Sequence, residues 1–210
     1  MSTDERTGFV DVLAKIVSVI FHPLLMPVYG LIIIFSVPVL GYLPFEVKRL
    51  IVFVVLINNV LLPLSLFPFL RYRNLITSWS VNSRTERMIP LLFTTLLYAA
   101  TSYIINKFPI PGFLKSYVLA IFFLSLVVTL IYFWKLISLH SVAAGALISL
   151  VLILSFKLYS PLIWYLIGIL VISGILLSSR LKLGYRTPGQ VWTGFLTGFV
   201  VLGMLIWYLQ

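Results

Sequence analysis

The chain contains no cysteine, and only five of its 210 residues are acidic. The absence of cysteine excludes disulfides, thiolate metal sites and cysteine nucleophiles. The few carboxylates are too sparse for a divalent-metal site, because hard cations require several oxygen ligands. Charged residues make up 10% of the chain, whereas an average soluble domain has roughly 25%. A soluble globular protein is therefore excluded.

Long apolar segments dominate what is present: 61% of the residues are hydrophobic and the mean hydropathy is +1.15. Segment after segment reaches the ~20 residues that an α-helix needs to cross ~30 Å of hydrocarbon, whereas barrel strands would be shorter and alternate in polarity. We therefore predict an all-α fold, a polytopic transmembrane helical bundle with about seven hydrophobic spans. The spans are placed at residues 24–41, 48–70, 88–106, 115–135, 140–157, 161–180 and 189–209.

The N-terminal region has a different pattern. Within residues 8–21, Asp11 and Lys15 stand one helical turn apart among apolar residues, which is typical of a helix lying in the membrane interface. His22 and Pro23 then interrupt the pattern. We expect an N-terminal tail and interfacial helix over residues 1–23, with no cleaved signal peptide, and a single transmembrane domain over residues 24–210.

The net charge of +10 would suggest nucleic acid as a partner of a soluble protein. Here the basic residues lie in short loops between spans, where they set orientation and contact anionic lipids, so the lipid bilayer is the expected partner and nucleic acid is not. Ten of the fifteen basic residues fall on the side of the N-terminus. The positive-inside rule then predicts a cytoplasmic N-terminus. Without the four arginines of the site considered next, the two sides have six and five basic residues, and the charge difference no longer favours either orientation.

Three polar clusters return to one side of the membrane when the crossings are counted: residues 83–90, 135–141 and 178–190. Together they gather guanidinium groups, one imidazole and several hydroxyls near the lipid headgroups. A guanidinium suits phosphate because its planar fork bonds two oxygens and stays charged. The candidate phosphate-binding residues are Arg84, Arg87, Arg180 and Arg186. The alternative is that these arginines are ordinary interfacial anchors.

His140 is the candidate for proton chemistry, because a histidine at the mouth of a basic site can donate a proton to a leaving oxygen. The alternative is an interfacial histidine bonded to backbone or water. Small residues follow it at helical spacing and predict close helix packing, as does the "GFLTG" pattern in the last span. His22 has no comparable neighbours, and we expect it to lie outside the site. Asn58 and Asn59 are interpreted as interhelical hydrogen-bonding residues.

The order and spacing of the clusters resemble the integral-membrane branch of the type 2 phosphatidic acid phosphatase and vanadium haloperoxidase superfamily. Its motifs are Lys-x6-Arg-Pro, Pro-Ser-Gly-His and Ser-Arg-x5-His-x3-Asp, gathered at one end of a helical bundle. The resemblance covers roughly residues 80–200. Ser179 and Arg180 match the third motif, and "ISLHS" keeps Ser138 and His140 of the second. For the first motif, Arg84, Arg87 and Pro90 supply basic residues and a proline, but they do not have the Lys-x6-Arg-Pro spacing.

The resemblance implies that arginines hold a phosphate, that the third-motif histidine attacks phosphorus with help from the aspartate, and that neither a metal nor another cofactor is needed. This chain has Arg186 at the histidine position and Gln190 at the aspartate position. An arginine stays protonated and cannot attack, and a neutral glutamine cannot stabilise an imidazolium. The phosphate-holding positions are kept, and the attacking pair is replaced.

Three hypotheses follow. The first is a pseudoenzyme in a bacterial cytoplasmic membrane that binds a phosphorylated lipid through Arg84, Arg87, Arg180 and Arg186, with His140 donating a hydrogen bond and Ser138, Ser179 and Gln190 supporting the site. The second is an active lipid phosphate phosphatase in which His140 is the nucleophile or general base. The third is a structural subunit of a membrane complex, whose basic face anchors to anionic lipids.

Overall fold

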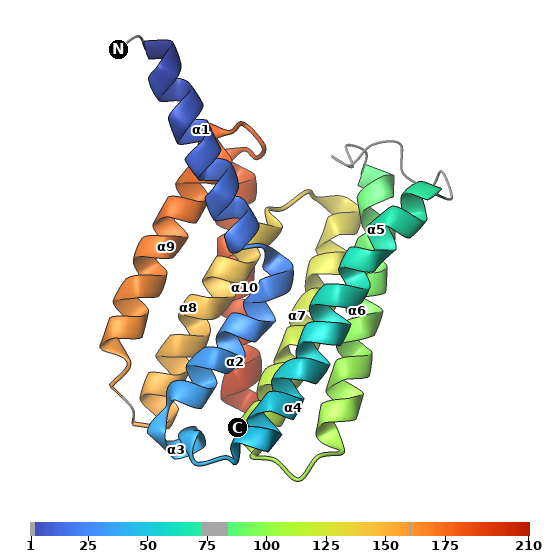
Figure 1. The fold of residues 1–210 in the computed structure, drawn as a ribbon, viewed down its shortest axis with the longest axis vertical. Helices are drawn as coiled ribbons and strands as arrows, with labels where there is room; N and C mark the ends of the chain where they lie inside the picture. The colour runs from blue at the N-terminus through green and yellow to red at the C-terminus, as the bar shows by residue number, and fades with distance from the viewer. Residues whose placement is uncertain (1–2, 73–83, 160) are drawn as a thin grey trace. The chain divides into compact units, whose positions relative to one another are not determined.

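The computed structural model describes residues 3–72, 84–159 and 161–210, and within these ranges it contains helices and no strand (Figure 1). The predicted all-α class is confirmed. The helices are α1 (Thr3–Ile20), α2 (Met26–Ser36), α3 (Pro38–Gly41), α4 (Phe45–Leu56), α5 (Leu62–Tyr72), α6 (Arg84–Asn106), α7 (Gly112–Trp134), α8 (Leu139–Lys157), α9 (Ile163–Lys182) and α10 (Pro188–Leu209). A short 3-10 turn, η1 (Pro23–Leu25), precedes α2, and a π-helical turn, η2 (Ile57–Leu61), joins α4 to α5.

Seven segments of the described residues are long and apolar enough to cross a membrane. All seven overlap the spans expected from the sequence; the six that follow the first are Phe45–Leu66, Met88–Asn106, Gly112–Trp134, Leu139–Lys157, Ile163–Lys182 and Pro188–Leu209. The first, Asp11–Ser36, begins well before the expected residue 24, because α1 and α2 are both apolar on either side of His22. The chain is a multi-pass integral membrane protein.

The helices form two compact units. The first contains residues 1–26 and 137–207, and so joins α1 and η1 to α8, α9 and most of α10. α8 is its most buried helix, with every residue from Ser141 to Val151 buried. α9 packs against both α8 and α1. The predicted N-terminal helix is therefore present and lies along α9, while its depth in the membrane stays a prediction.

α8 and α10 meet through glycines. A Cβ atom added to Gly198 would lie 1.9 Å from the Val142 carbonyl oxygen, and one added to Gly145 would lie 2.1 Å from the Phe195 carbonyl oxygen. Only glycine, which lacks a Cβ, permits two backbones to approach this closely. The close packing predicted from "GFLTG" and from the small residues after His140 is confirmed. It holds the start of α8 beside the start of α10.

The second unit contains residues 27–136 and 208–210. α6 and α7 pack against each other as neighbouring helices, and η2 contacts α4, α5 and α6. Buried hydroxyls link its helices: the Thr101 hydroxyl donates to Asn59 Oδ1 over 2.7 Å, and Thr95 lies within 2.9 Å of Thr129. Asn59 thus hydrogen-bonds between helices as the sequence predicts.

Candidate functional site

The connection between α9 and α10 has a defined geometry. Gly184 ends α9 in the left-handed conformation, with φ of 65°, and its N–H donates to the Leu181 carbonyl. Glycine adopts this conformation without the steric penalty of a Cβ, which makes it the usual residue just after a helix. Arg180 lies in the last turn of α9, and Arg186 follows the glycine by two residues. The tight turn therefore brings two guanidinium groups to one end of the unit.

α10 begins with a capping box formed by Thr187 and Gln190. The Gln190 N–H donates to Thr187 Oγ1 over 3.4 Å, and the Thr187 N–H donates to Gln190 Oε1 over 3.3 Å. Pro188 occupies the first helical position, where its missing N–H costs no hydrogen bond. The polar residues before the last span thus start a helix. Gln190, considered above as a supporting site residue, uses its side-chain oxygen in this cap.

The start of α8 is hydrogen-bonded to the start of α10. The Ser138 N–H donates to the Gln190 carbonyl oxygen over 3.1 Å. The buried Ser138 side chain caps α8 by accepting from the Ser141 N–H and from the Ser141 hydroxyl. The structure therefore brings together two of the three segments that the sequence analysis placed on one side of the membrane. It gives Ser138 a defined role in positioning His140, two residues later.

His140 is partly buried in the first turn of α8. Its Nε2 lies 3.1 Å from the Ser18 carbonyl oxygen of α1. A carbonyl oxygen can only accept, so Nε2 carries the proton in this hydrogen bond, and in the neutral imidazole Nδ1 carries the lone pair. Arg180 and Arg186 both lie within electrostatic range of the ring. The structure thus joins three of the predicted site residues.

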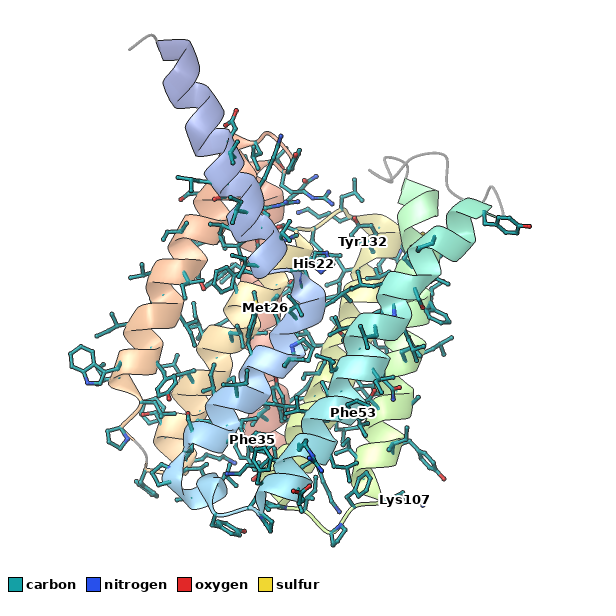
Figure 2. The ribbon with its side chains drawn as sticks, in the orientation of Figure 1. His22, Met26, Phe35, Phe53, Lys107 and Tyr132 are labelled. Atoms are coloured by element: carbon teal, nitrogen blue, oxygen red, sulfur yellow. The ribbon has the colours of Figure 1, made fainter. Side chains whose placement is uncertain are left out.

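His22 also lies in this cluster, so the interpretation that it has no comparable neighbours is wrong, while its part in a functional site is not tested. Its ring centroid is 5.7 Å from that of His140, with the rings at 81°, and Arg180 lies within electrostatic range of it. Figure 2 shows His22 where α1 ends and the chain turns into η1. Sequence reasoning missed it because its neighbours are distant in the chain, 118 positions away in the case of His140. The local signal was the His-Pro pair at a helix break.

Two further contacts involve the side chains of Arg180 and of the preceding residue, Ser179. The Arg180 guanidinium carbon lies 4.9 Å from the centroid of the Tyr185 ring, a distance at which the ring face attracts a cation. The hydroxyl of buried Ser179 donates to the Ile175 carbonyl oxygen over 2.7 Å, one turn back in α9. The ring of Tyr185 therefore helps to orient Arg180, whereas Ser179 hydrogen-bonds within its own helix.

Arg84 and Arg87 lie in the first turn of α6, which belongs to the second unit. Their side chains are outside the described part of the structure. Their assignment as phosphate-binding residues stays a prediction from the sequence.

The assignment of a function to this cluster rests on its own chemistry. No family model, curated protein or solved structure matches the chain. The resemblance to lipid phosphatases stays a prediction from the sequence.

The cluster combines two guanidinium groups and the His140 imidazole, near the ends of candidate spans, with the His22 imidazole at the helix break inside the first span. The sequence contains no aspartate or glutamate after residue 86, so neither α8, α9, α10 nor their connections supply a carboxylate. Among the described residues there is no group of three or more histidines or carboxylates that could hold a metal ion. Positive charge combined with N–H donors favours an anion as the ligand.

Proposed function

We propose that this membrane protein binds the phosphate group of a phosphorylated membrane lipid at the start of α8 and the α9–α10 connection, without hydrolysing it. The observation that carries the proposal is the hydrogen bond from the Ser138 N–H to the Gln190 carbonyl oxygen, which holds the start of α8, with His140, beside the segment that carries Arg180 and Arg186. Guanidinium groups bond two phosphate oxygens at once and remain charged. Their attraction for a bound anion is stronger where the surrounding medium solvates charge poorly.

A lipid phosphate suits this location better than a soluble anion. Arg180 is two residues from the end of one span, and Arg186 is two residues before the next begins. Groups at span ends lie near the headgroup level, where lipid phosphates are also found. The acyl chains of such a ligand would remain in the bilayer. We assign phosphate contacts to Arg180 and Arg186, and the assignment of Arg84 and Arg87 stays a prediction from the sequence.

We propose no hydrolysis because of the residues at positions 186 and 190. In the family that the chain resembles, these positions hold the nucleophilic histidine and the aspartate that orients it. Arg186 has no lone pair at any pH that the protein survives. The Gln190 side chain is neutral and its oxygen accepts from the Thr187 N–H. A site with these residues retains attraction for phosphate and lacks the nucleophile that covalent catalysis requires.

The experiment is equilibrium binding of a short-chain phosphatidate to the purified protein in zwitterionic micelles. We expect Arg180→Ala to weaken binding at least about tenfold, since a lost hydrogen bond to a charged group costs about 1.5–3 kcal/mol. Lys182→Ala is the matched control: it removes one positive charge from the same helical turn, at an exposed position. Equal losses in the two variants would mean that only general charge attraction is present.

The same titration distinguishes specific binding of a lipid headgroup from nonspecific anchoring to anionic lipids. A headgroup site prefers phosphatidate, a phosphate monoester, over phosphatidylglycerol, a diester with one fewer ionisable oxygen, at a fixed salt concentration. A structural subunit that only anchors to anionic lipids would bind both alike and lose both as salt rises. Preference for phosphatidate that survives 0.3 M salt is the expected result.

One observation favours a second candidate function. Because His140 donates from Nε2 to the Ser18 carbonyl, its neutral ring presents an Nδ1 lone pair, which a general base or a nucleophile needs. An active lipid phosphate phosphatase would use that nitrogen. Phosphate release from phosphatidate that disappears in His140→Ala would establish this function in place of simple binding.

A further inference from the structure

We propose that His22 is a ligand-binding residue of this site, and that it donates its Nε2–H to the phosphate that Arg180 holds. The inference rests on the proposed function and extends it by one residue, contributed by the N-terminal part of the chain. The ligand class is a phosphate monoester. Four observations carry the proposal: the tautomer of His22, its position, the complementary tautomer of His140 and the anchoring of α1.

The hydrogen bonding of His22 sets which nitrogen carries its proton. The Leu24 N–H donates to His22 Nδ1 over 3.3 Å, so that His22 caps the short turn η1. A nitrogen that accepts a hydrogen bond carries no proton, and neutral imidazole has one proton to place. Nε2 of His22 is therefore an N–H donor, and it lies on the side of the ring away from the cap.

The ring lies where such a donor is useful. His22 and His140 contact each other edge to face, and the charge of Arg180 acts on both. His22 is partly buried at the break between α1 and η1 (Figure 2). A phosphate bound to Arg180 next to the two rings would meet the His22 N–H and a guanidinium, the kinds of donor that phosphate oxygens accept from.

The two histidines present opposite groups. His140 already donates its Nε2–H to the Ser18 carbonyl, so as a neutral ring it offers a ligand only the Nδ1 lone pair. His22 offers an N–H. While both rings are neutral, His22 is the imidazole that can donate to a fully ionised phosphate, and His140 can only accept from a protonated phosphate oxygen or from water. The sequence alone assigns the donor role to His140 and no role to His22.

The position of His22 is held from both sides. On its N-terminal side α1 packs along α9, the helix that carries Arg180, and four residues before His22 the Ser18 carbonyl is bonded to His140. On its C-terminal side, η1 contacts α8. Because its flanking segments are fixed on the helices of the other site residues, binding needs little ordering of His22.

A purely structural His22 would serve only as the cap of η1, and a substitution separates the two roles. Asparagine is a strong N-cap residue, so His22→Asn keeps an acceptor for the Leu24 N–H and removes the Nε2 donor. We expect His22→Asn to unfold at nearly the wild-type temperature and to bind dihexanoyl phosphatidate about tenfold more weakly. Unchanged affinity in this folded variant would overturn the proposal.

A spectroscopic measurement tests the contact directly. The chain has two histidines, so the imidazole nitrogens of the protein labelled with 15N-histidine give two sets of signals, which His22→Asn assigns. Titration with dihexanoyl phosphatidate is expected to shift the Nε2 signal of His22, and to leave it unshifted in Arg180→Ala. Movement of the His140 signals alone would contradict the proposal.

This experiment distinguishes a lipid phosphate from free phosphate as the ligand. It also distinguishes a failure of the proposed function from a failure of the role of His22. Inorganic phosphate that produces the same shift at similar concentrations would identify a free-phosphate site, whereas a shift confined to phosphatidate identifies a lipid headgroup; His22 is the donor in either case. If wild type binds neither probe, the proposed function fails and His22 fails with it. If Arg180→Ala loses binding and His22→Asn keeps it, only the role of His22 is refuted.

Discussion

Replacing Gly198 by alanine should separate α8 from α10. The new Cβ would lie 1.9 Å from the Val142 carbonyl oxygen, 1.5 Å closer than the 3.4 Å at which ordinary contact begins. Its nearest neighbours are backbone atoms, which cannot rotate away as a side chain does. We therefore expect the clash to reduce the free energy of unfolding by about 3 kcal/mol, the upper end of the usual cost of overpacking. Alanine recovers up to ~1 kcal/mol through its better helix propensity, so the net destabilisation is about 2 kcal/mol.

For a chain of this length, about 2 kcal/mol corresponds to a Tm lowered by roughly 4–8 °C. The assay is thermal unfolding of the detergent-solubilised protein, followed by the loss of helical circular dichroism. Gly174→Ala in α9 is the matched control, because a Cβ there meets no atom within 4 Å, and it should leave Tm unchanged or slightly raised. Equal Tm values for the two variants would refute the close approach of α8 and α10.

Two further predictions concern the start of α10 and the proposed absence of hydrolysis. Thr187→Ala removes the acceptor of the Gln190 N–H and should cost about 1 kcal/mol, a Tm lower by about 2–4 °C. Thr197→Ala removes a hydroxyl that donates to the Thr193 carbonyl oxygen within α10 and should lower Tm less; the reverse order would contradict the capping box. Wild type should release no phosphate from phosphatidate above a protein-free control. The double variant Arg186→His, Gln190→Asp should release more, because it places an imidazole nucleophile at position 186 and a carboxylate that can orient it at position 190.

The membrane spans were predictable because the hydrophobic length and the Pro/Gly breaks are local signals. The fifth span was placed at residues 140–157, and the structure has Leu139–Lys157. The glycines of the last span likewise predicted close packing from spacing alone, and Gly198 meets Val142. The start of the first span could not be predicted from the sequence. Asp11 and Lys15 suggest an interface helix, whereas α1 packs on α9 through a tertiary contact that no local pattern predicts.

The candidate site was predictable only in part. Counting crossings correctly joined the segment of His140 to that of Arg180 and Arg186. It could not find His22, because the contact between the two histidine rings depends on how α1 lies against α9. Gln190 shows the opposite case: comparison with a family motif suggested a site role, while the T-x-x-Q pattern that predicts a capping box was already present in the sequence.

Native mass spectrometry of the protein extracted from vesicles tests the central claim most directly. The vesicles contain equal amounts of phosphatidate, phosphatidylglycerol and phosphatidylcholine, and the proteins are wild type, Arg180→Ala and Lys182→Ala. If the cluster binds a phosphate monoester, wild type and Lys182→Ala will each retain one phosphatidate, and Arg180→Ala will lose it. Retention of phosphatidate and phosphatidylglycerol in equal amounts by all three proteins would contradict the claim and leave only general attraction to anionic lipids.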